Sequence, residues 1–106
     1  MSQADYFDRI DQTFEAVESC LEELPEDPDI ATAEGVINVT FANGVVFVFS
    51  RQPPVEQLWL ATPGGGFHFT WDTALNDWLD TKTDESFGHI LVTELRQHTG
   101  VNINWE

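Results

Sequence analysis

Apolar side chains recur at helical spacing in the first part of the chain. Over residues 3–24 they return every three or four positions, and at about 100° per residue they fall within an arc of about 80°. Neither Gly nor Pro interrupts this stretch, and Pro25 and Pro28 follow it. The pattern predicts an amphipathic helix over 3–24 whose buried positions are Tyr6, Ile10, Phe14, Val17, Leu21 and Leu24.

After residue 29 the apolar period changes to two, which is typical of β-strands. Asn43-Gly44 is the preferred sequence of a two-residue hairpin turn, and Pro53-Pro54 ends the strand that follows it. Because the links between strands are short, we expect an antiparallel sheet. The predicted strands are 36–42, 45–50, 57–61 and 67–71, with shorter ones at 29–33 and around 78–79.

A second helical pattern covers residues 84–99. Thr83 or Asp84 is the expected N-cap, with Asp84 and Glu85 in the first turn. Gly100 is the expected stop, and an extended tail follows it.

The order of these elements is helix, strands, helix, and each helix has one apolar face. This order predicts an α+β fold, a two-layer α/β sandwich in which two helices pack on one face of an antiparallel sheet of five to six strands. The other face is then open to solvent or to a partner. At this length, residues 1–106 are expected to form a single domain.

The chain is very acidic, with 19 Asp and Glu against 4 Lys and Arg and a formal net charge of −15. Such a surface repels nucleic acid and anionic membranes, and it attracts metal cations and basic protein patches. No apolar run approaches the roughly 20 residues of a membrane helix. Residues 1–5 lack the basic and apolar regions of a signal peptide, so we expect a cytoplasmic location in a bacterium. Cys20 is the only cysteine, which excludes an internal disulfide.

The acids of the first helix form a continuous line beside its apolar face. They lie within about 80° of one another, centred about 120° from that face, and Arg9 is the only base in this stretch. Like charges at i,i+4 destabilise a helix by about 0.2–0.5 kcal/mol each, so the line is costly. It consists of Asp8, Asp11, Glu15, Glu18 and Glu22, and Glu23, Glu26, Asp27 and Asp29 extend it past the helix.

Carboxylates are hard oxygen donors that suit iron, manganese, calcium and magnesium. A row on one helix cannot surround an ion, so binding is expected to be weak, multiple and poorly selective. The competing interpretation is a solubilising face in a very acidic protein.

The strand region carries a more specific pattern. Arg51-Gln52-Pro53 is followed by Gln57-Leu58-Trp59-Leu60-Ala61-Thr62 and then by Gly65-Gly66-Phe67-His68-Phe69. This succession resembles the frataxin family, in its bacterial branch, and the resemblance extends over essentially the whole chain.

The resemblance implies binding of ferrous or ferric iron along the first helix and the edge of the next strand. It also implies two partners, the cysteine desulfurase and the scaffold protein of iron–sulfur cluster assembly, and a monomer that forms oligomers with iron. The candidate metal ligands, called the acidic ridge below, are Glu15, Glu18, Glu22, Glu23, Glu26, Asp27 and Asp29. The candidate partner residues are Glu18, Glu22, Arg51, Gln52, Gln57 and Trp59.

Strand alternation places Trp59 on the open face, because Leu58 and Leu60 face the helices. An exposed Trp is a common interface anchor. His68 is expected on the same face, and His89 and His98 are expected to have ordinary surface roles.

Three functions stay open at this stage. The first is a metal-binding adaptor of iron–sulfur cluster assembly. The second is a ferroxidase, although no buried catalytic constellation is visible in the sequence. The third is an acidic interaction protein without a metal role.

Overall fold

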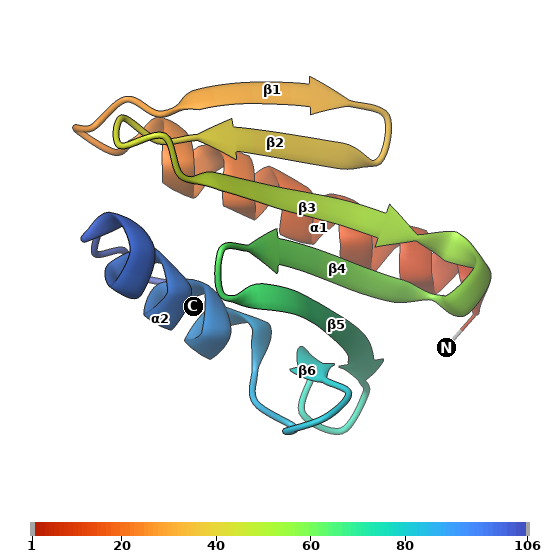
Figure 1. Cartoon of the computed structure of the whole chain (residues 1–106). Coiled ribbons are helices and arrows are strands. Elements are labelled where there is room, and N and C mark those ends of the chain that lie inside the picture. The colour runs from red at the N-terminus through yellow and green to blue at the C-terminus, as the bar shows by residue number, and fades with distance from the viewer. Residues whose placement is uncertain (1, 106) are drawn as a thin grey trace.

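Six antiparallel strands lie side by side in the order in which they occur in the chain. They belong to a computed structural model that describes residues 2–105. Every strand therefore pairs with its neighbour in sequence, as Figure 1 shows. The strands are β1 (Asp29–Ala33), β2 (Val36–Thr40), β3 (Val46–Gln52), β4 (Gln57–Thr62), β5 (Gly65–Asp72) and β6 (Asp77–Asp80).

The sheet has one buried face and one open face. Helices α1 (Gln3–Glu22) and α2 (Phe87–Thr99) cover the same face, and the core lies between them and the strands (Figure 1). The predicted α+β sandwich of five to six strands is thus confirmed, and the sheet has six. The most deeply buried apolar residues of the strands are Ile37, Val39, Phe47, Phe49, Leu58, Leu60, Phe69 and Trp78, all at most 2% exposed.

Helix α1 follows the predicted pattern closely. Tyr6, Ile10, Val17 and Leu21 are buried, while Phe14 is only partly buried at the margin of the core. The helix ends at Glu22, two residues before the predicted end, because the chain turns at residues 24–27. In that turn the Asp27 N–H donates to the Leu24 carbonyl (3.1 Å), and Pro28 then enters the interior.

The hairpin connecting β2 and β3 differs from the predicted two-residue turn. The Gly44 N–H donates to the Phe41 carbonyl (2.9 Å), and the Phe41 N–H donates to the Val45 carbonyl (2.8 Å). Gly44 has a positive φ of 86°, whereas Asn43 does not have a positive φ. A type I′ turn needs positive φ at both positions, so this loop is the longer type with Gly in the left-handed conformation.

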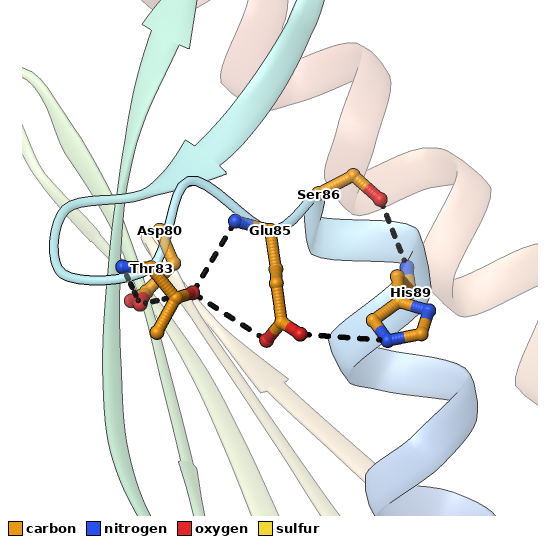
Figure 2. A network of polar contacts seen from close by, with 5 residues as sticks. All are labelled: Asp80, Thr83, Glu85, Ser86 and His89. Atoms are coloured by element: carbon orange, nitrogen blue, oxygen red, sulfur yellow. Dashed lines mark hydrogen bonds and ion pairs between the residues drawn. The ribbon is translucent and has the colours of Figure 1, made fainter.

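Helix α2 begins at Phe87, three residues after the predicted start, and Ser86 is its N-cap. The preceding loop folds around the carboxylate of Asp80, which is 4% exposed (Figure 2). That carboxylate accepts hydrogen bonds from the Thr83 N–H (3.0 Å) and the Thr83 hydroxyl (2.9 Å). Asp84 consequently lies in the left-handed region (φ 62°), where a helix cannot continue.

The C-terminal end of α2 agrees with the prediction. Gly100 caps it in the left-handed conformation, and its N–H donates to the Arg96 carbonyl. The tail then packs back onto the core, where Trp105 meets Phe87 edge to face. A Cβ on Gly88 would lie 2.2 Å from the Trp105 ring, so glycine permits this close approach.

Candidate functional site

The acidic ridge runs along α1, through the loop that follows it, and onto the start of β1 at one edge of the sheet. In Figure 1 this loop leaves the end of α1 and enters β1 at the same end of the molecule. Glu18 is partly buried, and the other six ridge residues are exposed. The predicted ligands therefore do lie along one continuous surface.

No cation neutralises this ridge among residues 2–105. The ion pairs of this part of the chain involve Glu34, Glu85 and Glu94. Arg9, the only base on α1, is directed elsewhere: its guanidinium lies over the Trp71 ring, 5.1 Å from the centroid. The ridge thus presents its full negative charge to solvent.

The ridge is an open row and does not form a cage. Within residues 2–105, no three His, Cys, Asp or Glu side chains converge on a point that suits a metal ion. An ion on the ridge would take one or two carboxylates, and water would complete its shell. Such an arrangement favours hard cations and exchanges them readily.

The open face carries a second candidate surface, centred on Trp59. The strand register places Trp59 directly beside Ser50 on β3 and His68 on β5. The Trp59 and His68 rings are stacked, with centroids 4.2 Å apart and an interplanar angle of 11°. The indole N–H of Trp59 donates to Oε1 of Gln57 (2.7 Å). The predictions that Trp59 and His68 share the open face are confirmed.

Arg51 does not belong to this surface, although it was expected there with Gln52, Gln57 and Trp59. It pairs in register with the buried Leu58, so it points to the helix side. Its guanidinium lies over the Phe7 ring (5.2 Å) and pairs with Glu34 (3.2 Å). The alternation from the buried Phe49 to Arg51 is a signal in the sequence that could have revealed this placement.

His98 is also not an ordinary surface residue. Its side chain is only 19% exposed, and Nε2 is buried 3.4 Å from Oε1 of Glu94. Glu94 in turn accepts a hydrogen bond from the Thr62 hydroxyl (2.5 Å). The cluster fastens α2 to the turn after β4, a contact between distant segments that helical periodicity alone does not reveal.

His89 does have the expected surface position. It lies within 3.7 Å of Glu85 at the edge of the loop network in Figure 2. Ser86 in that network accepts a hydrogen bond from the His89 backbone N–H (3.1 Å), as an N-cap does. The network therefore organises the start of α2 and does not pair a nucleophile with a base.

Cys20 lies on α1 beside a groove of about 350 Å³ that Ala16, Ser19 and Trp105 also line. Burial raises the pKa of its thiol, and the nearby Glu23 carboxylate raises it further. A thiol with a raised pKa is a poor nucleophile and metal ligand at neutral pH.

Comparison with known proteins assigns the chain to a family. A family model described as the frataxin-like domain matches residues 1–101. The chain belongs to the frataxin-like family. Among curated relatives in this family, the iron-sulfur cluster assembly proteins CyaY of Pseudomonas fluorescens (strain Pf0-1) and Ectopseudomonas mendocina are each 37% identical to it. Each alignment covers 100% of this chain and 96% of the relative.

Solved frataxin structures have the same fold. A frataxin from Psychromonas ingrahamii superposes with a TM-score of 0.86 at 23% identity, covering 98% of this chain and 97% of that one. A trimeric yeast frataxin, complexed with ferrous ion, superposes with a TM-score of 0.67 at 25% identity, covering 92% and 85%. In addition, neither helix within residues 2–105 is long and apolar enough to span a bilayer.

Proposed function

We propose that this chain binds iron weakly on the acidic ridge and acts in iron–sulfur cluster assembly. It serves as an iron donor, as a regulator of the cysteine desulfurase, or as both. The observation that carries this proposal is the exposed row of carboxylates with no paired cation among residues 2–105. The names of its curated relatives and the ferrous complex of yeast frataxin support the same function.

The ridge has two roles in this proposal. It takes up ferrous or ferric iron through exposed carboxylates, and other divalent or trivalent cations substitute for iron because the donors are hard and the geometry is loose. It also docks on a basic patch of the desulfurase, with Glu18 and Glu22 at the contact. The scaffold protein is the second partner, and Gln52, Gln57 and Trp59 on the open face are the residues that meet the assembly machinery.

A desulfurase assay tests the docking role. Sulfide production is measured with and without this protein, comparing the wild type with the double variant Glu18→Lys/Glu22→Lys. The double variant should lose most of the effect on the desulfurase. A matched control, Glu34→Lys/Glu85→Lys, changes the net charge equally at exposed sites off α1 and should behave as the wild type. Equal losses in both variants would mean that overall charge, and not the ridge, is recognised.

A metal titration tests the iron role separately. Ferrous ion is added anaerobically to ¹⁵N-labelled protein, and amide signals are followed by NMR. Signals near the ridge should broaden first, while those of α2 stay sharp. Uniform broadening, or none on α1, would refute metal binding at the ridge.

We also propose that the protein works in the bacterial cytoplasm and is a monomer until iron is added. Iron on the ridge reduces the repulsion between very acidic copies, and this allows association. Sedimentation with and without ferrous ion measures the change. A trimer in metal-free buffer would contradict this part.

A further inference from the structure

Two contacts within the chain limit how Trp59 can bind another molecule. One face of its ring is covered by His68, and its only polar atom, the indole N–H, already donates to Gln57. A partner therefore gains little by accepting a hydrogen bond from the indole. The remaining ring face is the surface that Trp59 offers for contact.

Small and polar groups lie on the remaining side. Ser50 stands opposite Trp59 in the register, on the side away from His68, and both side chains are partly exposed. Gln52, next on the same face of β3, donates through Nε2 to the Ser50 hydroxyl (3.4 Å). Within residues 2–105, Oε1 of Gln52 accepts no side-chain hydrogen bond, and Gln52 is the next residue along from Ser50 on this face.

The charges make this position suitable for a cation. The chain has 4 Lys and Arg, and none of them lies on the open face: Arg9 and Arg51 face the helix side, Lys82 follows β6, and Arg96 lies on α2. Arg9 and Arg51 each cover an aromatic ring, at 5.1 and 5.2 Å. Apart from His68, no cation or aromatic ring of residues 2–105 packs on Trp59. A partly exposed indole on a molecule of net charge −15 attracts a cation from outside.

We propose that Trp59 binds an arginine side chain of a partner protein. The guanidinium lies flat on the ring face that His68 does not cover, beside Ser50, and donates to Oε1 of Gln52. Arginine fits better than lysine because its planar group stacks on an indole while its N–H donors point outward in the plane. The inference rests on the proposed function in one respect: the partner carrying the arginine belongs to the assembly machinery.

The recognition chemistry is tested first without any partner. The indole N–H signal of Trp59 is followed by NMR while N-acetylarginine amide is added to the whole chain. The signal should shift and saturate at millimolar concentration, because one stacked cation contributes only a small binding energy. N-acetyllysine amide should give a smaller shift and N-acetylcitrulline amide, which lacks the charge, almost none. No shift with N-acetylarginine amide would overturn the proposal. An equal shift with N-acetylcitrulline amide, or with N-acetylleucine amide as an uncharged apolar control, would also overturn it.

Two variants locate the site. Ser50→Leu places a bulky side chain against the Trp59 ring face that His68 does not cover. This variant should abolish the arginine-induced shift. Thr70→Leu is the control, because Thr70 is exposed on the same face but stands opposite Gln57. It should keep the wild-type shift. If Ser50→Leu also keeps it, with a native-like spectrum, the arginine does not lie where we place it.

The assembled desulfurase–scaffold complex is the final probe. Ser50→Leu should weaken binding to it by about 3- to 30-fold, in line with one partly desolvated cation–π contact. Thr70→Leu should not weaken it. If Ser50→Leu binds as the wild type while Glu18→Lys/Glu22→Lys does not, the arginine contact is wrong and the proposed function stands. If wild-type protein does not bind the complex at all, the proposed function fails, and the arginine titration decides the contact independently.

Discussion

Helix α1 carries an unbroken line of acids and has no basic residue in its last turn, where Glu23 is the C-cap. Helix α2 begins at the Ser86 N-cap, has Arg96 and His98 in its last turn, and ends on a left-handed Gly100. Both helices cover the same sheet face (Figure 1). The basic residues in the last turn of α2 match the helix dipole, whereas the acids at the end of α1 oppose it.

The two helices consequently depend on different interactions. The Tyr6 hydroxyl of α1 donates to the Gln57 carbonyl (2.7 Å) and accepts from the Gln52 N–H (3.0 Å), so it joins the ends of β3 and β4. Thr13, about two turns further along α1, accepts from the Trp78 indole N–H (2.8 Å). Contacts with the sheet thus hold α1 in place, and they leave its outer side free to carry charge. Local caps contribute more to α2.

The largest expected effect on stability comes from removing the hydrogen bonds between the Tyr6 hydroxyl of α1 and the sheet. Tyr6→Phe removes the buried hydroxyl and leaves the Gln57 carbonyl and the Gln52 N–H without it. Unpaired buried polar groups cost about 1–3 kcal/mol, so the free energy of unfolding should fall by this amount. Urea unfolding measures it. If Tyr6→Phe lowers the free energy of unfolding by less than Ser86→Ala, the cap variant described next, then α1 does not depend on this contact.

The corresponding change in α2 removes a local cap. Ser86→Ala deletes the oxygen that accepts from the His89 N–H (3.1 Å). The expected loss is about 1 kcal/mol, as for other N-cap replacements, and Ser86→Asp should restore most of it. Thermal unfolding of the three proteins checks this. Failure of Asp to rescue would show that Ser86 acts through something other than capping.

A smaller effect of opposite sign is expected at the end of α1. Glu22→Lys places a cation in the last turn and relieves its repulsion with Glu18, which should raise the free energy of unfolding by about 0.5–1 kcal/mol at low salt. The same variant should bind less iron. Arg96→Glu in α2 is the mirror change and should destabilise the protein. High salt should shrink both effects, and a gain that survives high salt would not be electrostatic.

The smallest effect concerns pH. Burial raises the pKa of the Tyr6 hydroxyl, partly offset by the hydrogen bond from the Gln52 N–H. The unfolded chain therefore loses this proton first. The stabilising contribution is complete below about pH 10 and declines as pH rises toward the folded pKa. Tyr6 is the only tyrosine, so ultraviolet absorbance reports its titration directly. A midpoint at or below that of the urea-unfolded chain would contradict the prediction.

Several features were predictable from the sequence because they depend on local periodicity. The apolar face of α1, the order of the strands and the open-face position of Trp59 follow from periods of 3.6 and two. The helix-side placement of Arg51 was predictable from the same strand alternation, although the family resemblance grouped Arg51 with the residues of the open face.

Other features depend on contacts that no local pattern contains. The start of α2 shifts to Phe87 because the carboxylate of Asp80 organises the loop and forces Asp84 into a left-handed conformation. The burial of His98 depends on Glu94 and on Thr62, which is distant in sequence.

The same division applies to the two functional surfaces. The sequence by itself determined the line of acids, because helix periodicity fixes which residues share a helix face. Only the tertiary structure decided where the basic side chains lie. The Arg9 guanidinium lies over the Trp71 ring, and the Arg51 guanidinium lies over the Phe7 ring. Strand register, a relation between separate segments, decided that His68 covers one face of Trp59 and that the small Ser50 stands on its other side. The acidic line is therefore a local property of α1, and the surface around Trp59 exists only in the folded sheet.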